Sequence, residues 1–245
     1  MKVLAAILGL IGAAPAAVAA SPCEDVTFDG ASFTVCAVDP AAEEVRLFLY
    51  DGDGAPYASF RAIDGALRRS GQALGVAMNA GMYHPDRSPV GLYVQDGREV
   101  MRLVTSEGPG NFGLLPNGVL CLGEDRAEIV ESRAFAAAGR DCRSATQSGP
   151  MLVIDGALHP RFLPGSDSLN VRNGAGVDED GTLWFAISNE AVNFHTFARL
   201  FRDRLGTPNA LYLDGSVSRL YDAASGRHDA GWPMGPIIGT VREAG

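Results

Sequence analysis

The sequence predicts an α+β fold: a single domain in which a mixed, mainly antiparallel sheet with hairpins is flanked by helices. Short apolar segments alternate with Asp-Gly and Asn-Gly pairs along the chain. Such pairs tolerate the positive φ angles of tight hairpin turns, and hairpins join antiparallel strands. Two further segments carry apolar residues at helical spacing, and helices interspersed with hairpins are typical of α+β proteins. No Pro/Ser-rich linker or charge block divides the chain, so we expect one domain over residues 21–245.

The beginning of the chain has the composition of a secretory signal peptide. A short basic start, Met1-Lys2, precedes an apolar run over residues 3–14, and Ala17-Val18-Ala19 then supplies small residues at alternate positions. This apolar run is too short for a membrane anchor with a polar flank, although an uncleaved anchor is the alternative interpretation. We expect residues 1–20 to be removed, and the mature protein to be periplasmic or secreted with no membrane span.

The chain is acidic, with a formal net charge of -9 at pH 7. Lys2 is its single lysine, so the basic side chains of the rest of the chain are arginines and histidines. A protein that binds nucleic acid needs a basic stripe along the phosphate backbone, and this sequence has none. We therefore expect no nucleic-acid partner.

The 4 cysteines of the chain predict disulfide bonds, because an even number in an exported protein is usually paired. Three pairings are possible, and we expect the neighbouring cysteines to pair, Cys23 with Cys36 and Cys121 with Cys142. A zinc site is the alternative, but the sequence has neither a Cys-x-x-Cys spacing nor clustered histidines.

The predicted strands follow one another along the chain, most of them next to a turn pair. They are residues 45–50 before Asp51-Gly52-Asp53-Gly54, 90–94 and 100–104 around Asp96-Gly97, 112–115 and 119–122 around Asn117-Gly118, 151–154 before Asp155-Gly156, and 177 with 183–187 around Asp178-Glu179-Asp180-Gly181. A further short, apolar strand is expected over residues 210–213. These segments predict a sheet that is assembled largely from hairpins.

The first predicted helix is based on the apolar spacing of Phe60, Ile63, Leu67 and Leu74, and we expect it to be interrupted or to end near Gly71. The second is based on apolar residues at i, i+3, i+4, i+7 and i+11, namely Phe194, Phe197, Ala198, Phe201 and Leu205. Asn193 is a natural N-cap for this helix, and Gly206 ends it.

Four polar clusters that contain glycine interrupt the otherwise apolar segments. They are residues 78–83 (Met-Asn-Ala-Gly-Met-Tyr), 145–150 (Ala-Thr-Gln-Ser-Gly-Pro), 172–176 (Arg-Asn-Gly-Ala-Gly) and 213–218 (Leu-Asp-Gly-Ser-Val-Ser). Small residues at a strand end allow backbone amides to approach an oxyanion closely. Four such clusters in one domain predict a shared pocket.

Taken in order, these clusters resemble the phosphodiester glycosidase family, which includes the domain of the lysosomal "uncovering" enzyme and many bacterial exported proteins. The resemblance runs from about Val76 to Gly239 and also includes residues 89–92, 111–112, 116–118 and 194–201. In the lysosomal branch the last motif is Asp-Gly-Gly-Gly-Ser. This chain has Asp214-Gly215-Ser216-Val217-Ser218, which keeps the acidic residue but lacks the extra glycines.

The resemblance implies an exported hydrolase that cleaves the glycosidic bond of sugar-1-phosphodiesters, in envelope or extracellular polysaccharide metabolism. Glycosidic cleavage passes through an oxocarbenium-like state, which a carboxylate stabilises or attacks. The phosphate monoester that departs is already a weak base, so it needs cationic charge and hydrogen bonds more than a proton. The partner would thus be a glycosyl phosphodiester or an envelope glycan, and the site would need a carboxylate, an arginine and several donors.

The resemblance assigns Asp214 to the anomeric carbon and Arg172 to the phosphate. Glu190 is a second catalytic candidate, or only a favourable charge near a helix start. The substrate-binding candidates are Asn79, Gln147, Ser148, Gly149, Asn173, Gly215 and Ser216. Simpler interpretations stand beside these: Asp214-Gly215 as one more hairpin turn, Arg172 as a surface arginine, and Asn79 as a cap of a strand end.

No cofactor and no metal are expected, because the histidines at positions 84, 159, 195 and 228 show no metal-ligand spacing. Two other functions remain as alternatives. One is a non-catalytic envelope glycan-binding module that keeps the pocket without turnover. The other is a phosphodiesterase or transferase that acts at phosphorus and breaks the P–O bond.

Overall fold

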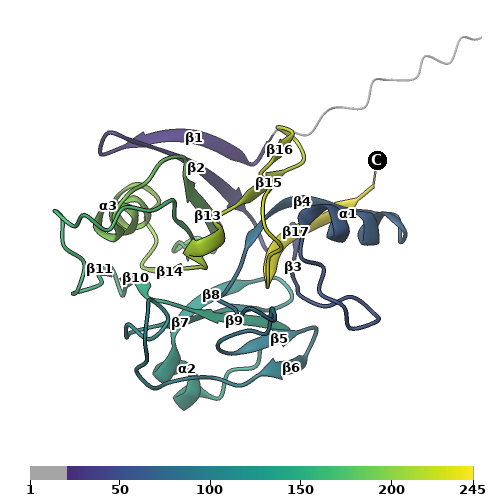
Figure 1. Cartoon of the computed structure of the whole chain (residues 1–245), viewed down its shortest axis with the longest axis horizontal. Helices are drawn as coiled ribbons and strands as arrows, with labels where there is room; N and C mark the ends of the chain where they lie inside the picture. Colours follow the sequence, from purple (N-terminus) through teal and green to yellow (C-terminus); the bar gives the residue numbers. More distant parts are fainter. Residues whose placement is uncertain (1–20, 245) are drawn as a thin grey trace, which may run out of the picture.

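The computed structural model describes residues 21–244, in which three antiparallel sheets and three α-helices surround a shared apolar core (Figure 1). The first sheet has seven strands in the order β1 (Cys23–Phe28), β2 (Ala31–Val38), β13 (Leu183–Ser188), β12 (Asn173–Val177), β14 (Asn209–Tyr212), β10 (Met151–Ile154) and β11 (Ala157–Leu158). Every strand pair described in it is antiparallel.

The other two sheets have five strands each. One has the order β16 (Arg227–His228), β15 (Leu220–Asp222), β4 (Gln72–Asn79), β17 (Ile237–Glu243) and β3 (Glu44–Phe48). The last has the order β6 (Arg98–Met101), β5 (Tyr93–Gln95), β9 (Ser144–Ser148), β7 (Gly118–Leu122) and β8 (Ala127–Glu131). The first two sheets therefore each combine strands from two separate parts of the chain, whereas the third is built from the consecutive strands β5 to β9.

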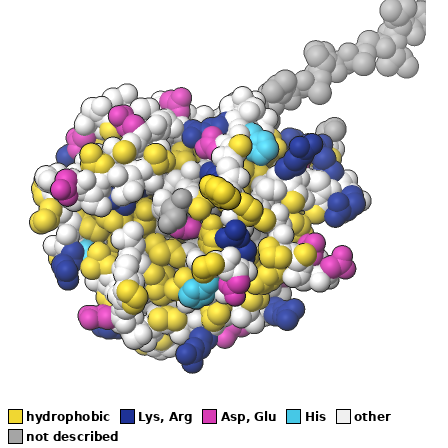
Figure 2. Space-filling view, viewed as in Figure 1, with side chains coloured by type: hydrophobic (Ala, Val, Ile, Leu, Met, Phe, Trp, Pro, Cys, Tyr) yellow, Lys and Arg dark blue, Asp and Glu magenta, His cyan; other side chains and the backbone are white. Residues whose placement is uncertain are grey.

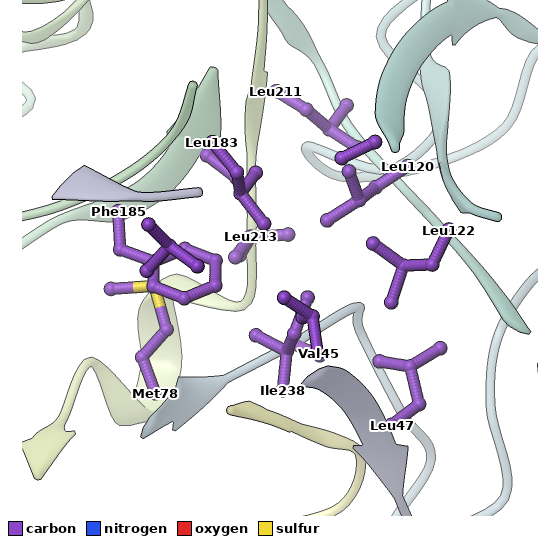
Figure 3. Close-up of a cluster of buried hydrophobic side chains, with 14 of the residues drawn as sticks. Val45, Leu47, Met78, Leu120, Leu122, Leu183, Phe185, Leu211, Leu213 and Ile238 are labelled. Atoms are coloured by element: carbon purple, nitrogen blue, oxygen red, sulfur yellow. The ribbon is translucent and has the colours of Figure 1, made fainter. Parts of the chain in front are cut away.

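One apolar cluster joins the inner faces of all three sheets. Figure 3 shows side chains from the different sheets pointing toward one another. Side chains alternate along a strand, so Leu183, Phe185 and Ile187 of β13 enter this core. Ala186 faces the opposite side of the sheet. The sheets can thus be described as three walls around one interior.

Each sheet is covered on its outer face by one helix. The helix α3 (Phe194–Arg199), continued by a π-helical turn (Leu200–Arg204), packs on the first sheet. Helix α1 (Phe60–Arg68) covers the second sheet, and α2 (Ser132–Ala138) covers the third. This arrangement of mainly antiparallel sheets with flanking helices confirms the predicted α+β fold.

The structure contains both expected disulfide bonds, so the predicted pairing is confirmed. Cys23–Cys36 joins facing positions of β1 and β2. Cys121–Cys142 joins β7 to the segment that follows α2.

The hairpin predictions are confirmed at most turn pairs. Asp96-Gly97 joins β5 to β6 with φ angles of 51° and 77°, and Asp155-Gly156 joins β10 to β11 with 47° and 80°. The prediction of a hairpin at Asn117-Gly118 is wrong, because residues 112–115 form no strand. Asn117 is instead buried, and its Nδ2 donates to the carbonyl of Phe112. Gly118 begins β7, whose partners come from later in the chain.

Both helix predictions are confirmed, except that Leu74 lies outside the first helix. The first helix ends at Arg68, the chain turns at Gly71 with a φ of 75°, and Leu74 belongs to β4. Leu74 packs in the same cluster as Phe60 and Ile63, which explains why helical spacing seemed to include it. The second helix begins as expected, with the Asn193 side chain accepting from the amide of Thr196.

No helix within residues 21–244 is long and apolar enough to cross a membrane. The predicted signal peptide, residues 1–20, lies outside the described residues.

Candidate active site

The four clusters predicted to share a pocket meet where their strands end. The amide of Asp214, just after β14, donates to the carbonyl of Ala80, just after β4, at 3.1 Å. The amide of Leu213 donates to the carbonyl of Asn173 at the start of β12, also at 3.1 Å. These bonds bring segments of two different sheets to the same point.

The remaining cluster, which ends β9, is bonded to both of these segments. The amide of Tyr212 donates to the carbonyl of Pro150 at 3.1 Å. The amide of Gly81 donates to Oγ1 of Thr146 at 3.2 Å. A Cβ atom at position 81 would lie 2.5 Å from the carbonyl oxygen of Gln147, so this approach requires glycine. The third sheet is thereby joined to the same site.

Two fully buried amides hold the backbone around Asp214. Nδ2 of Asn79 donates to the carbonyl of Asp214 at 2.7 Å and to Oδ1 of Asn173 at 3.3 Å. In return, Nδ2 of Asn173 donates to the carbonyl of Asn79 at 3.0 Å. Oδ1 of Asn79 accepts from the amide of Arg219 at 2.9 Å. Both side chains are therefore positioning groups beneath the site.

Asp214 itself is 8% exposed and is followed by a 3₁₀ turn, Gly215–Val217. The charge of its carboxylate raises the pKa values of two tyrosines. Burial raises the pKa of Tyr83 above its ordinary value, and the nearby Asp214 raises it further. Burial also raises the pKa of Tyr212; Arg172 opposes this shift and Asp214 adds to it. Both tyrosines consequently stay protonated at neutral pH and can donate hydrogen bonds beside a carboxylate.

Arg172 lies behind Tyr212, with only 1% of its surface exposed. Its Nε donates to the carbonyl of Val192 at 2.8 Å, and one terminal nitrogen donates to the carbonyl of Ser168 at 2.8 Å. The guanidinium carbon lies 3.6 Å from the centroid of the Phe194 ring and 5.5 Å from that of Tyr212. Burial lowers the pKa of Arg172, whereas Tyr212 raises it. Arg172 is thus a buried cation and not the surface arginine of the simpler interpretation.

Gln147 and Ser148 point to opposite faces of β9. Oε1 of Gln147 accepts from the amides of Leu92 and Val104 at 3.0 Å each. Its Nε2 donates to the carbonyl of Val104 at 2.6 Å and to Ser132 at 2.7 Å, so the whole amide is used within the protein. Ser148 is fully buried, and its Oγ has no hydrogen-bond partner among the described residues.

The other predicted residues lie as follows. A Cβ atom at Gly149 would lie 2.7 Å from Cβ of Asn117, so this glycine allows close packing of the chain. Glu190 is exposed, and its carboxylate accepts from the amide of Ser32 in β2 at 2.7 Å. The side chain of Ser216 lies outside the described part of the structure.

Three residues that were not candidates in the sequence belong to this region. Tyr83 and Tyr212 lie close enough to Asp214 for its charge to raise their pKa values. Arg219 is 8% exposed, and one of its terminal nitrogens donates to the carbonyl of Trp232 at 2.6 Å. Tyr83 ends the first cluster and Arg219 directly follows the last one, so proximity to the motifs was the available signal. Within residues 21–244, no group of three or more His, Cys, Asp or Glu side chains could hold a metal ion.

Comparisons with known proteins agree on one family. The sequence model of the phosphodiester glycosidase family matches residues 72–239. The chain is 34% identical over 207 residues to the uncharacterized protein YigE of Escherichia coli strain K12. The match covers 84% of this chain and 80% of YigE.

Two solved structures share the fold at low sequence identity. One is the catalytic domain of zebrafish N-acetylglucosamine-1-phosphodiester alpha-N-acetylglucosaminidase, auto-inhibited by its pro-peptide, with a TM-score of 0.63, 14% identity, and coverage of 89% of this chain and 81% of that one. The other is a Burkholderia pseudomallei protein inferred to be exported, with a TM-score of 0.58, 15% identity, and coverage of 86% and 74%. With the family model matching more than half of the sequence, this chain belongs to the phosphodiester glycosidase family, a family of hydrolases.

Proposed function

We propose that this protein is an exported hydrolase that cleaves the glycosidic bond of sugar-1-phosphodiesters, with Asp214 as its catalytic carboxylate. The observation that carries the proposal is the convergence of the other three strand-end clusters on the backbone of residues 212–214. Family membership supports the substrate class. Two disulfide bonds, the sequence of residues 1–20 and the likeness to a Burkholderia protein inferred to be exported support a periplasmic or secreted location.

In the proposed reaction, the bond between the anomeric carbon and the phosphate oxygen breaks, and its electron pair leaves with the phosphate. Asp214 stabilises or attacks the anomeric carbon as positive charge develops there. Water then supplies a hydroxyl group to that carbon, so the products are a free sugar and a phosphate monoester. The protonated hydroxyl of Tyr83, which is only partly buried, would donate to a departing phosphate oxygen in place of its 3.5 Å bond to the carbonyl of Pro233.

The role of Arg172 follows from its burial. With 1% of its surface exposed, its guanidinium cannot readily wrap a phosphate, and two of its donors are already bonded to carbonyl groups. We assign it to orienting Tyr212 from behind and to adding positive charge beneath the phosphate. Arg219, which is also near Tyr83, adds a second positive charge at the site.

Gln147 is left out of the proposed substrate contacts, because its amide is fully bonded to Leu92, Val104 and Ser132. Glu190 is left out as well, since its carboxylate is bonded to β2. Ser148 stays a candidate for a buried hydrogen bond beside the site, because its Oγ needs a partner.

The test is hydrolysis of sugar-1-phosphodiesters by purified protein and by an Asp214→Asn variant. We expect the variant to lose about 10³-fold or more of kcat/KM, because the carboxylate acts on the transition state. Asp155→Asn is the matched control, since Asp155 is also followed by glycine but lies in the turn between β10 and β11. Circular dichroism would verify that both variants are folded.

Three results would contradict the proposal. Equal activity of the wild type and Asp214→Asn removes Asp214 from the mechanism. Saturable glycan binding with no product from any diester supports a glycan-binding module instead. In oxygen-18 water, label in the sugar indicates cleavage at the anomeric carbon, whereas label in the phosphate indicates attack at phosphorus.

A further inference from the structure

Arg172 is a cation with almost no access to water, since 1% of its surface is exposed. Most basic side chains visible in Figure 2 lie toward the outline of that face, where water solvates them. A buried charge is costly unless other groups replace its water. None of the ion pairs between side chains of residues 21–244 includes Arg172. The groups that surround its guanidinium therefore decide where this charge is held.

One face of the guanidinium is covered by an aromatic ring. Its carbon atom lies 3.6 Å from the centroid of the Phe194 ring. The two carbonyls that it bonds belong to Ser168 and Val192, at 2.8 Å each. Val192 and Phe194 flank Asn193, the N-cap of α3, so one bond and the ring contact both come from the start of this helix. The π electrons of the ring supply the attraction that a carboxylate would otherwise supply.

The Phe194 ring is backed by two further rings. It stacks on Phe162 with 4.8 Å between centroids and 6° between planes, and Phe162 stacks on His159 with 4.7 Å and 24°. Nδ1 of His159 accepts from the amide of Arg161 at 3.2 Å, so Nε2 donates to the carbonyl of Leu115 at 3.2 Å. Burial lowers the pKa of His159, which keeps its ring neutral at neutral pH. We call the rings of His159, Phe162 and Phe194 the aromatic column.

The guanidinium also faces Tyr212, which lies under the turn after Asp214. Its carbon atom is 5.5 Å from the centroid of the Tyr212 ring, and the edge of one ring meets the face of the other between Phe194 and Tyr212, at 4.7 Å and 81°. The hydroxyl of Tyr212 packs against Gly215, where a Cβ atom would overlap it. A shift of the guanidinium would therefore reach the backbone beside Asp214 through Tyr212.

We propose that the aromatic column positions Arg172, and that Phe194 thereby sets the position of Tyr212 and of the turn that carries Asp214. Phe194 is a positioning residue, because it acts through Arg172. The proposal rests on the proposed function and deepens it, since it identifies what holds the positive charge beneath the phosphate. If Phe194 only filled space, any apolar side chain of similar size would serve in its place.

The first test replaces Phe194 with leucine, which keeps an apolar side chain but removes the ring. Phe194→Leu should lower kcat for a sugar-1-phosphodiester about tenfold, the size expected of one cation–π contact away from water. KM should change less than about twofold, because Arg172 is buried beneath the site. Phe194→Tyr should keep kcat within about twofold, since a tyrosine ring offers a similar face. A leucine variant as active as the tyrosine variant would overturn the proposal.

Phe201→Leu is the matched control. Phe201 follows α3 in the π-helical turn, is fully buried, and meets the ring of Phe197 at 5.4 Å. Because Phe194 is only half-buried, the control loses at least as much apolar packing. Its urea midpoint should fall, yet its kcat should stay within about twofold of the wild type. A fall in kcat as large as that of Phe194→Leu would show that packing alone is responsible and would overturn the proposal.

The second test does not depend on turnover. The Nε–H of Arg172 is buried and bonded, so in nitrogen-15-labelled protein its signal should exchange slowly with water. An Arg172→Lys variant, which lacks this group, identifies the signal. Phe194→Leu should speed its exchange at least about tenfold, whereas Phe194→Tyr and Phe201→Leu should leave it slow. A signal that stays equally protected in Phe194→Leu would overturn the proposal.

The two measurements separate this proposal from the proposed function. Faster exchange in Phe194→Leu, with no hydrolysis of any sugar-1-phosphodiester by the wild type, would keep the aromatic column and remove the proposed function. Hydrolysis by the wild type, with equal kcat and equal protection in Phe194→Leu, would keep the proposed function and remove the aromatic column.

Discussion

Gly215 directly follows Asp214, and its α-carbon packs against the hydroxyl of Tyr212. A Cβ atom at this position would overlap that hydroxyl. The Asp-Gly pair here therefore has a different origin from the pairs in the hairpins. In Asp96-Gly97 the glycine is needed because it adopts a positive φ. At position 215 glycine is needed because it has no side chain. The dipeptide is the same, but the physical reason for glycine differs.

Gly215→Ala should therefore displace Tyr212 or the turn that holds Asp214. We expect a loss of about 1–3 kcal/mol of unfolding free energy, as for other overpacked sites, together with a fall in kcat. Urea denaturation and steady-state kinetics measure the two effects. Gly52→Ala is the control, because a Cβ atom there meets nothing within 4 Å. Equal behaviour of the two variants would mean that the turn adapts freely.

Asn79 and Gln147 illustrate what residue type alone can and cannot predict. Both are amides two residues before a glycine in a polar cluster, and both are fully buried or nearly so. Asn79 bonds the backbone of Asp214, whereas Gln147 bonds the backbone of Leu92 and Val104. The difference arises because successive residues of a strand face opposite sides, and the sheet pairing decides which side faces the site.

At the scale of elements, Asn193 has a larger role than the N-cap predicted for it. Its Oδ1 accepts from the amide of Thr196, which begins α3. Its Nδ2 donates to the carbonyls of Pro164 and Ser166, at 3.0 and 3.4 Å. The same loop supplies the carbonyl of Ser168 to Arg172. The cap thereby couples the start of α3 to the segment that holds the buried arginine.

Asn193→Ala should lower the unfolding free energy by about 2 kcal/mol, because the cap and the bonds to the loop are lost together. Ser59→Ala should cost about 1 kcal/mol, since Ser59 caps α1 through a single bond to Ala62. Only the first variant should also lower kcat. Urea denaturation and kinetics provide the comparison, and equal losses in the two variants would argue against the coupling.

The elements that were predicted well are those with local causes. The turn at Asp155-Gly156 forms because both residues adopt a positive φ, and α3 begins at Asn193 because its side chain caps the first turn. The errors arose where distant packing decides. Asn117 looks like a turn residue, yet it is buried and bonded to Phe112. Leu74 fits a helical period but is in β4, where it reaches the same apolar cluster.

At the scale of the whole molecule, three sheets share one apolar interior, and each has its own helix outside. The candidate site lies where strands of all three sheets end, so it depends on how the sheets meet. The two disulfides act on different parts of this assembly. Cys23–Cys36 lies within a hairpin, whereas Cys121–Cys142 fixes the segment after α2 to the third sheet.

Replacing both Cys121 and Cys142 by serine should lower the unfolding free energy by about 3 kcal/mol, because the bridge spans a sequence separation of 21 residues. Replacing Cys23 and Cys36 should cost less. Their separation is 13, and the hairpin already pairs these strands in the folded protein. Thermal and urea unfolding measure both variants. A greater loss from the hairpin bridge would show that strand pairing contributes less than proposed.

The sequence by itself determined the class of fold, the local turns and caps, and the family, because each depends on neighbouring residues or on ordered motifs. The disulfide pairing was one of three possibilities, among which the folded structure decided. The tertiary structure alone decided which polar residues meet. Asp214 is joined to Ala80 and Asn79 across sheets, while Gln147 faces away, and Tyr83 and Arg219 enter the site although neither was a candidate in the sequence. The physical reason is that strand register and the packing of one sheet on another set these contacts over more than a hundred residues of chain, a distance at which local patterns carry no information.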